Sequence, residues 1–392
     1  MNTEEESVNG QNLILLAAAK FTSGFASYIY DIGIVIYLFA QTGSVAVIGG
    51  FFIAQLLPAF IILLAGSIID RYNKKNLMVW SHLIKAASFV LLLIDRSILS
   101  IYIVTFIMNL LLEFEVSTLN ALMTNIFPKK HLLKAASITN LLDSFSMVAA
   151  PVSASFIAMH FQIQMNLTID IILFAASAVI YMFLRLTDNP NATAGEAASS
   201  KIRYLSMIKD NKLLKTIIFW NIFMLCIGIT TPLEISMIEN TLQMPSSYYG
   251  IGNTVEGIGM LAASGLILWR VRKLRPDKII IIGLFSAAFS YLVIGTAGNI
   301  FIYYTGACLV GMTACLCPLG FKTEIQMKCE QTVIGRVFTT TRFTVLLSRI
   351  AGSLIVGNVL KIWNIRIIYL WVAVILILAA LWALFYEKQK GD

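Results

Sequence analysis

Charged side chains are scarce in this sequence. Asp, Glu, Lys and Arg make up 13% of the 392 residues, whereas 58% are hydrophobic and the mean hydropathy is +0.81. An ordinary soluble domain has about 25% charged and about 45–50% apolar residues. Too few polar side chains remain to cover a water-soluble globule. The composition therefore excludes an ordinary soluble domain and predicts that lipid surrounds most of the chain.

Residues that bind metals or carry out catalysis are also few. The five cysteines lie in or beside apolar stretches, and no histidine is spaced to complete a metal site with them. His82, His131 and His160 are scattered, so no Ser–His–Asp set can be assembled. A glycine-rich phosphate-binding loop is missing, which excludes ATP as the energy source. We expect no metal, no cofactor and no enzymatic activity.

Long apolar runs are abundant. A membrane-spanning helix needs about 20 mostly apolar residues, and such runs predict twelve spans. Their ranges are Leu13–Phe39, Val45–Ile69, Leu77–Ile94, Leu99–Phe127, Ala135–Met159, Leu167–Leu186, Leu213–Met237, Ser247–Trp269, Lys278–Thr296, Ile300–Gln326, Ile334–Leu360 and Ile365–Phe385. The predicted fold is an all-α polytopic membrane protein.

Basic residues, which give a formal charge of +8, cluster in alternate connections between these runs. Clusters occur at 71–75, 129–134, 201–212, 270–278 and 388–390, whereas the intervening loops carry few lysines or arginines. The positive-inside rule then predicts that both termini are cytoplasmic, in the cell's inner (cytoplasmic) membrane. Loops that face an anionic leaflet explain the net charge, so we expect no nucleic-acid partner.

The chain divides into two similar halves. Residues 187–212 form a basic, Pro-, Gly-, Ala- and Ser-containing connection, which predicts a cytoplasmic linker between six-helix bundles at 1–186 and 213–392. Pro128–Ser137 corresponds in position to Cys329–Phe338, each leading into a long helix. Twelve helices in two pseudo-twofold-related bundles predict a binding site at the midplane, with transport by rocking of one bundle against the other.

The loop after the second span carries a recognisable motif, Gly66-Ser-Ile-Ile-Asp70-Arg71-Tyr-Asn73-Lys74-Lys75. It resembles the signature loop G-x-x-x-D-R-x-G-R/K-R/K of the major facilitator superfamily. The resemblance implies a conformational latch, formed by Gly66, Asp70, Arg71, Lys74 and Lys75, that holds the cytoplasmic side closed. Asn73 replaces the family's glycine, and asparagine also tolerates left-handed backbone.

Flanking residues are similar to one branch of that superfamily. Ile-Asp-Arg-Tyr-Asn-Lys-Lys and the later Lys-Ala-Ala-Ser-Ile-Thr-Asn resemble the branch of macrolide exporters and siderophore (enterobactin) exporters. Two features depart from drug/proton antiporters. The fifth-span motif G-P-x-x-G-G is reduced to Ala150-Pro151-Val-Ser-Ala154-Ser155, and the fourth span lacks their arginine. Proton antiport is thus less securely implied than the fold.

Charges inside the predicted spans are candidate functional groups, because each costs a few kcal/mol to insert. Five acids are predicted to couple protons or to line the substrate cavity: Asp31, Glu113, Asp143, Glu234 and Glu256. Glu115 is two positions from Glu113 among leucines, so helical spacing favours Glu113. Arg342 and Arg349 are seven residues apart on one helix side and are predicted to bind an anionic solute. Alternatively, the acids only form structural ion pairs with these arginines or with Lys20.

Three functions remain open. The first is a proton-coupled exporter of an amphipathic small molecule, either a siderophore-like anion or a drug. The second is a proton symporter that imports a small nutrient with the same acids. The third, a non-transporting membrane sensor or enzyme, lacks both a catalytic set and an output domain. Expected partners are a small-molecule substrate, protons and the lipid bilayer, with the protein as a monomer.

Overall fold

A computed structural model describes residues 2–61, 73–126, 129–184, 211–269, 275–329 and 334–388, and the described residues form helices and short connections without a strand. By contacts the chain forms two compact units. The first comprises Met1–Leu38 and Ala54–Glu196, and the second comprises Phe39–Ile53 and Ala197–Asp392.

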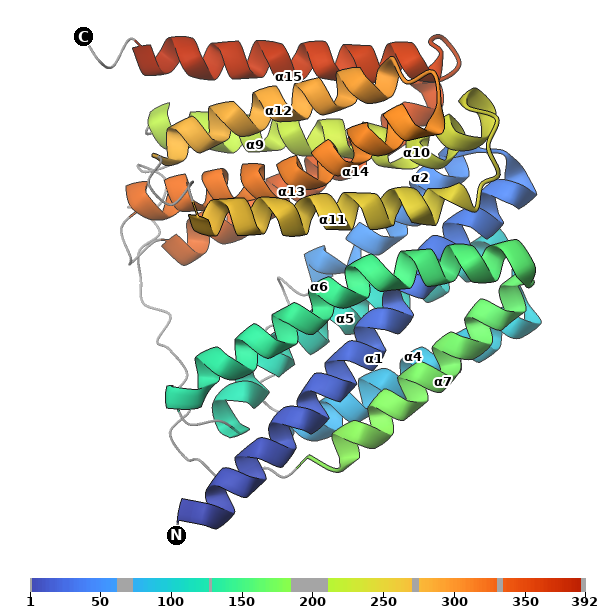
Figure 1. Cartoon of the computed structure of the whole chain (residues 1–392), viewed down its shortest axis with the longest axis vertical. Coiled ribbons are helices and arrows are strands. Elements are labelled where there is room, and N and C mark those ends of the chain that lie inside the picture. Colours follow the sequence, from blue (N-terminus) through green and yellow to red (C-terminus); the bar gives the residue numbers. More distant parts are fainter. Residues whose placement is uncertain are drawn as a thin grey trace. The chain divides into compact units, whose positions relative to one another are not determined.

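The described residues of the N-terminal half form six of the helices labelled in Figure 1. These are α1 (Asn2–Thr42), α2 (Val45–Leu56, with helical residues continuing to Ile61), α4 (Lys74–Ile94), α5 (Ile98–Ile126), α6 (Lys129–His160) and α7 (Ile163–Met182). Within the first unit α4 packs along both α5 and α7.

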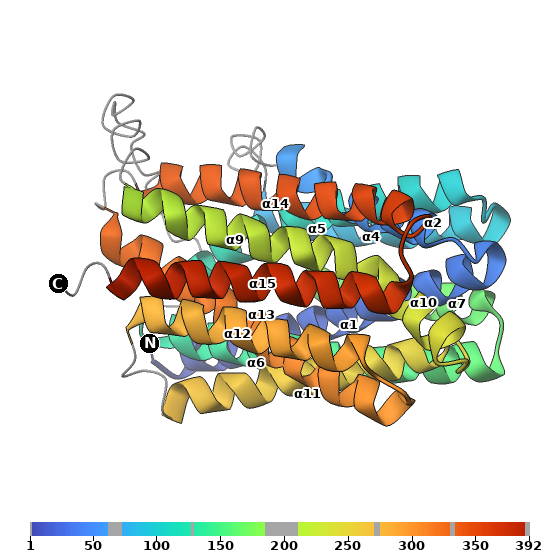
Figure 2. The same cartoon turned by 90° about the horizontal axis from the view of Figure 1, so that it is seen from above.

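The described residues of the C-terminal half form six more spans, which Figure 2 shows from above. These are α9 (Asn211–Thr230) with its continuation η1 (Thr231–Leu233), α10 (Glu234–Ser236) and η2 (Met237–Thr241), then α11 (Tyr248–Trp269), α12 (Pro276–Gly295), α13 (Ile300–Lys328), α14 (Ile334–Val359) and α15 (Ile365–Lys388). Here α13 packs along α11 and α12, α14 along α9, and α15 along α12.

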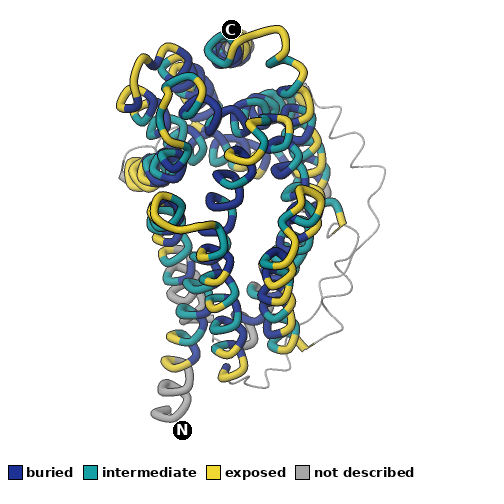
Figure 3. Tube along the Cα trace, turned by 90° about the vertical axis from the view of Figure 1, so that its right-hand side faces the viewer, coloured by how far each residue is buried: buried dark blue, intermediate teal, exposed yellow. Residues whose placement is uncertain are grey.

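These helices match the twelve predicted spans one for one, so the all-α, twelve-span prediction is confirmed. Ten described helices are long and apolar enough to cross a membrane, and Val45–Ile61 is a shorter apolar helix. The eighth predicted span is α11, which has 22 residues. Within each unit, buried positions face neighbouring helices while exposed ones, many of them large and apolar, form the outside (Figure 3). That distribution suits a bundle surrounded by lipid.

Local sequence signals end and begin several helices. Gly43 has φ +61° and donates its N–H to the Phe39 carbonyl at 2.8 Å, which closes α1 with a left-handed residue. Asn73 caps α4, since its side chain accepts the N–H groups of Lys75 and Asn76. The left-handed backbone considered for Asn73 is not found, because its φ is −63°. Its role is to begin a helix.

The turn between α4 and α5 is fixed by Asp95. Its carboxylate accepts hydrogen bonds from the Ser97 N–H, the Ser97 hydroxyl and the Ser100 hydroxyl. These bonds favour the ionised form, so they lower the pKa of Asp95 below its ordinary value. Asp95 therefore serves the turn.

The seventh span is irregular. After α9 the chain passes through a 3₁₀ turn containing Pro232, one turn of α-helix that begins at Glu234, and the π-helical stretch Met237–Thr241. Proline removes a backbone donor, and π-helical turns in proteins are frequent at functional sites. The irregular stretch holds one of the predicted acids, Glu234.

Small residues allow the helices of the second unit to approach closely. A Cβ on Gly259 of α11 would lie 2.0 Å from the Cys308 carbonyl oxygen of α13, and a Cβ on Gly311 of α13 would lie 1.9 Å from the Glu256 carbonyl oxygen of α11. Neither position has space for a side chain. Close backbone contact of this kind is typical of helix pairs in membranes.

The loop between α1 and α2 belongs to the second unit. Residues Phe39–Ile53 group with it, and a Cβ on Gly49 would lie 2.8 Å from the Ser353 carbonyl oxygen of α14. Ala46 lies against Gly357 on the same helix. Helices α1 and α2 therefore each run from one unit into the other. The predicted division at 1–186, 187–212 and 213–392 stays a prediction, since most of the linker lies outside the described residues.

Candidate functional site

The first unit contains a cavity of about 250 Å³ between its helices. It combines apolar walls with charged groups. The described lining residues are Lys20, Ser23, Gly24, Ser27, Tyr28, Asp31, Met78, Leu112, Glu115, Val116, Leu119, Asp143 and Tyr181. Two predicted acids therefore line the same cavity. Asp31 lies on the polar stripe of α1 that begins at Lys20, and Asp143 lies on α6.

Asp31 lies on the buried part of α1 and faces α2. Its Oδ1 accepts a hydrogen bond from Gln55 Nε2 at 2.7 Å. Among the described residues, the ion pairs found do not include Asp31. Within that part of the chain, Asp31 is therefore a cavity carboxylate whose negative charge is not balanced by a lysine or arginine.

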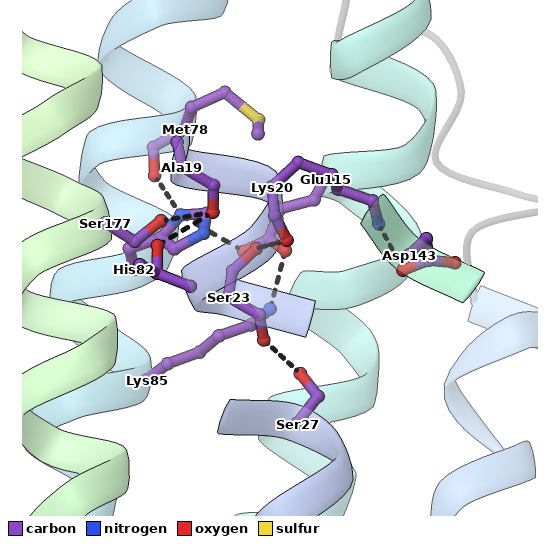
Figure 4. Close-up of polar contacts among 11 residues, drawn as sticks. Ala19, Lys20, Ser23, Ser27, Met78, His82, Lys85, Glu115, Asp143 and Ser177 are labelled. Atoms are coloured by element: carbon purple, nitrogen blue, oxygen red, sulfur yellow. Dashed lines mark hydrogen bonds and ion pairs between the residues drawn. The ribbon is translucent and has the colours of Figure 1, made fainter. Parts of the chain in front are cut away.

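Asp143 differs from Asp31 in having a basic partner. Its Oδ1 is 3.3 Å from Lys20 Nζ, and Figure 4 shows the pair joining α6 to α1. A Cβ on Gly24 would lie 3.3 Å from the same oxygen, so the glycine leaves room for the carboxylate. The structural alternative named for the acids, pairing with Lys20, thus describes Asp143.

A second ion pair lies on the wall formed by α4 and α5. Glu115 Oε2 is 2.6 Å from Lys85 Nζ, and both side chains are buried. The His82 ring is 0% exposed, with Nδ1 2.8 Å from the Met78 carbonyl oxygen and 3.5 Å from Glu115 Oε1 (Figure 4). Lys85 Nζ also lies 5.4 Å from the centre of the Phe174 ring. Lys85 and His82 therefore hold Glu115 in place on the cavity wall.

The preference for Glu113 over Glu115 is not supported by their positions. Glu115 lines the cavity, together with Leu112 and Leu119, whereas Glu113 is absent from the described lining and is partly exposed. Apolar neighbours on a helix were taken to mark a face directed away from the site. The cavity is itself partly walled by leucines, so that inference was wrong for Glu115. A role for Glu113 in coupling stays a prediction.

Three further charged or titratable groups escaped the sequence analysis. His82 was noted only as scattered, and Lys85 and Asp170 were not considered, although all three lie inside predicted spans. Asp170 on α7 is 0% exposed, and neither of its carboxylate oxygens has a hydrogen-bond partner. The same rule that selected Asp31, a charge within an apolar run, would have found Lys85 and Asp170.

The second unit brings Glu234, Glu256 and Arg349 close together. Arg349 on α14 interacts electrostatically with both carboxylates. The two acids line a space of about 10 Å³, enough for about one water molecule. Tyr291, Tyr303 and Tyr369 line the same space. These residues form a compact polar group inside the bundle.

The predicted arginine pair is only partly assembled. Arg349 faces two acids, which balance its charge, whereas Arg342 earlier on α14 is exposed. Binding of an anionic solute by these two residues stays a prediction. The position of Arg349 agrees better with the alternative in which it holds helices together through its acids.

Part of the predicted latch can be placed. Gly66, Asp70 and Arg71 lie outside the described residues, whereas Lys74 and Lys75 form the first turn of α4. Lys75 Nζ donates a hydrogen bond to the Leu184 carbonyl oxygen just beyond α7, at 2.8 Å. A lysine at a helix C-terminus satisfies its unpaired carbonyl groups. Lys75 thus ties the start of α4 to the end of α7.

Residues that commonly bind metals do not gather in the described part of the chain. No group of three or more His, Cys, Asp or Glu side chains there is placed to hold an ion. All five cysteines are free thiols.

Comparison with known proteins gives a consistent family assignment. The family model described as Major Facilitator Superfamily matches residues 16–344. A relative named uncharacterized MFS-type transporter YkuC, from Bacillus subtilis (strain 168), is 25% identical over 277 residues, covering 66% of this chain and 64% of the relative. Macrolide efflux protein A from Streptococcus pyogenes is 26% identical over 175 residues, or 43% of each chain. The alignments thus span less than two thirds of these relatives.

Solved structures share the fold at low sequence identity. The crystal structure of the nucleoside transporter NupG has a TM-score of 0.79 at 13% identity, covering 99% of this chain and 100% of that one. The peptide-family (POT) transporter PepTSo has a TM-score of 0.74 at 13% identity, with coverage of 97% and 99%. This likeness shows the fold alone.

Proposed function

Since this chain belongs to the major facilitator superfamily, a family of membrane transporters and not of enzymes, we propose that it is a proton-coupled exporter of amphipathic small molecules. It is a multi-pass membrane protein. Following the distribution of basic loops, we place it in the cytoplasmic membrane with both termini in the cytoplasm, acting as a monomer.

The carrying observation is that Asp31 has no basic partner among the described ion pairs. Glu115 and Asp143 each have a lysine partner, whereas the described ion pairs leave Asp31 with only the Gln55 hydrogen bond. A carboxylate inside a membrane bundle without a balancing cation is costly when ionised. Binding a proton, or a cationic group of the solute, removes that cost. Competition between the two for Asp31 is the basis of proton-for-solute exchange.

The cavity favours a solute with an apolar body and a positive group. Its described lining contains three acids, Asp31, Glu115 and Asp143, and one basic residue, Lys20. Lys85, which is not among the lining residues, forms an ion pair with Glu115. One negative charge remains, and leucine, valine, methionine and tyrosine side chains supply apolar surface. Among the two solute classes that the sequence suggested, a drug such as a macrolide bearing a tertiary amine fits this balance better than a siderophore-like anion.

Export is supported by the relatives named for macrolide efflux, which align with 43% of this chain. A symporter that imports a nutrient uses the same acids with the opposite coupling. The direction of solute movement under a pH gradient separates the two functions.

The test uses purified protein in proteoliposomes with an imposed pH gradient of each sign. The solutes are a radiolabelled amine-bearing macrolide and a catecholate siderophore. We expect the macrolide to move against the direction of proton flow. Movement of either solute with the protons would indicate a symporter, and no gradient-driven movement of any tested solute would remove the proposal. Replacing Arg349 by Gln tests the anionic alternative, which requires a selective loss of siderophore movement.

A further inference from the structure

Asp170 has no explanation in the function proposed so far. It is 0% exposed on α7, and neither carboxylate oxygen has a hydrogen-bond partner among the described residues. The other buried acid of this unit, Glu115, is held by Lys85, and Asp31 accepts a bond from Gln55. A structural acid is normally satisfied by such partners. Asp170 is therefore placed as a group that holds a proton.

The surroundings of Asp170 lead toward the cavity. Asn166, one turn earlier on the same buried face of α7, packs its amide against Gly33 of α1, where a Cβ would lie 2.1 Å from Asn166 Nδ2. The side-chain oxygen of Asn166, Oδ1, is also buried and has no hydrogen-bond partner among the described residues. Across this contact the Asp31 carboxylate interacts electrostatically with Asp170. Asp31 is among the described lining residues of the cavity and Asp170 is not.

Three helices that contact α7, namely α1, α4 and α6, carry charged or titratable groups, and those on α1 interact with Asp170 itself. On α1 they are Tyr30, whose hydroxyl is 2.7 Å from Thr105 Oγ1, and Asp31. On α4 they are Lys85 and His82, both directed at Glu115 and at the ring of Phe174, one turn after Asp170. From α6, Asp143 is paired with Lys20 on α1 and His160 is exposed. Asp31 is thus the acid that shares the environment of Asp170.

From this placement we propose that Asp170 is a second proton-binding site, which exchanges its proton with the cavity through Asp31. In the transfer, the O–H bond on Asp170 breaks and an O–H bond forms on Asp31, so the total charge of the two acids is unchanged. Asp31 then releases a proton into the cavity or takes one up from it. The inference deepens the proposed function, because Asp170 would store the proton while Asp31 contacts the solute.

Infrared spectroscopy of the purified protein tests the site without any transport. Aspartate is labelled with ¹³C at the side-chain carboxyl, and the carboxylic acid band is followed with pH. Two interacting acids lose their protons in two macroscopic steps. We expect the wild-type titration to contain two steps that are absent when both Asp31 and Asp170 are replaced by asparagine, and Asp170→Asn to lack one of these two steps. The variant Ser177→Ala, on the same buried face, should keep both.

The variant Asp31→Asn provides a second reading in case Asp170→Asn does not fold. One of the two steps should remain in it, because Asp170 is still present, and the double variant should have only the steps of the other aspartates. Loss of only one step in the double variant, or retention of both steps in Asp170→Asn, would overturn the assignment. So would a shift of the steps when potassium is replaced by sodium, since the site would then bind a metal cation. These results do not depend on the solute or on its direction of movement.

A transport arm separates proton storage from a merely structural role. In proteoliposomes, solute movement is measured with and without a pH gradient for Asp170→Asn and for the matched control Ser177→Ala, which should respond to the gradient as the wild-type protein does. The acceleration of Asp170→Asn by a pH gradient should fall at least tenfold. An unchanged acceleration would show that the proton on Asp170 does not take part in coupling. The infrared result stands apart from this outcome, so failure of the exporter proposal remains distinguishable.

Discussion

Replacing Asp31 by asparagine keeps the size of the side chain and removes the charge that a proton would neutralise. The Gln55 amide still has an oxygen to bind at that position. We expect Asp31→Asn to insert normally but to lose pH-driven transport by at least tenfold, measured in proteoliposomes. Glu113→Gln is the matched comparison, since Glu113 was predicted for the same role from a different helix. Normal pH-driven transport in Asp31→Asn would exclude Asp31 as the coupling acid.

The buried pair Lys85–Glu115 allows a stability test. Removing one member leaves the other charge unpaired in the bundle, a change that costs about 3–5 kcal/mol of unfolding free energy. We expect Lys85→Met and Glu115→Gln each to lower the thermal unfolding midpoint in detergent. The double variant should recover part of the loss. Lys278→Gln, at an exposed lysine, serves as the control. Additive losses in the double variant would show that the two residues are not coupled.

Single residues show what hydropathy can and cannot predict. Asp31 and Asp143 were found because a charge inside an apolar run is costly wherever it points. Choosing between Glu113 and Glu115 required the direction of each side chain, and the apolar wall of the cavity makes the leucine face of α5 look like a lipid face. Partners such as Gln55 and Lys85 come from other helices. Sequence spacing within one helix carries no information on them.

At the scale of elements, the contact between α11 and α13 is the most sensitive to added volume. In Gly311→Ala, the new methyl group would meet the Glu256 carbonyl oxygen, so the helices must separate. Such overpacking costs about 1–3 kcal/mol. We expect a lower unfolding midpoint and disturbed placement of Glu256. Gly265→Ala on α11 has nothing within 4 Å and should be neutral or slightly stabilising. Equal midpoints for the two variants would contradict the close contact.

Helix positions followed from the sequence better than helix irregularities. Apolar runs and the loops between them placed the helices because a membrane span needs a minimum apolar length. The break after Thr230 was missed: the run Leu213–Met237 is uniformly apolar around Pro232 and Glu234, and the shift to 3₁₀ and π geometry depends on neighbours in the bundle. Asn73 likewise was considered for its backbone tolerance and acts as a cap.

For the molecule as a whole, the α1–α2 connection offers a way to stop transport reversibly. A Cβ on Gly357 would lie 3.0 Å from Ala46 Cβ, slightly under the typical separation of about 3.5–4.5 Å in disulfides. We expect Ala46→Cys with Gly357→Cys to crosslink on oxidation and to block transport, with activity restored by reduction. The double variant is made with the five native cysteines replaced, and the single variants are controls. Full crosslinking with unaltered transport would show that this contact need not open.

The grouping of Phe39–Ile53 with the second unit was beyond the reach of the sequence. Hydropathy reports that a segment lies in lipid, and the basic loops report its direction, but neither reports which helices are its neighbours. The contacts of Gly49 with Ser353 and of Ala46 with Gly357 join residues that are far apart in the chain. A single sequence carries no pattern that pairs them.

The Gln55–Asp31 hydrogen bond has a mechanical consequence. It joins α1 to α2 next to the level at which both helices pass into the other unit, since Leu38 and Ala54 bound the first unit there. Helices α1 and α2 are rigid, and this hydrogen bond links them near one point. A small change at the bond therefore gives a larger displacement at the far ends of the helices. Protonation or deprotonation of Asp31 changes this hydrogen bond. The ends near Gly43 belong to the second unit, so a change at this hydrogen bond acts on two helices that have residues in both units.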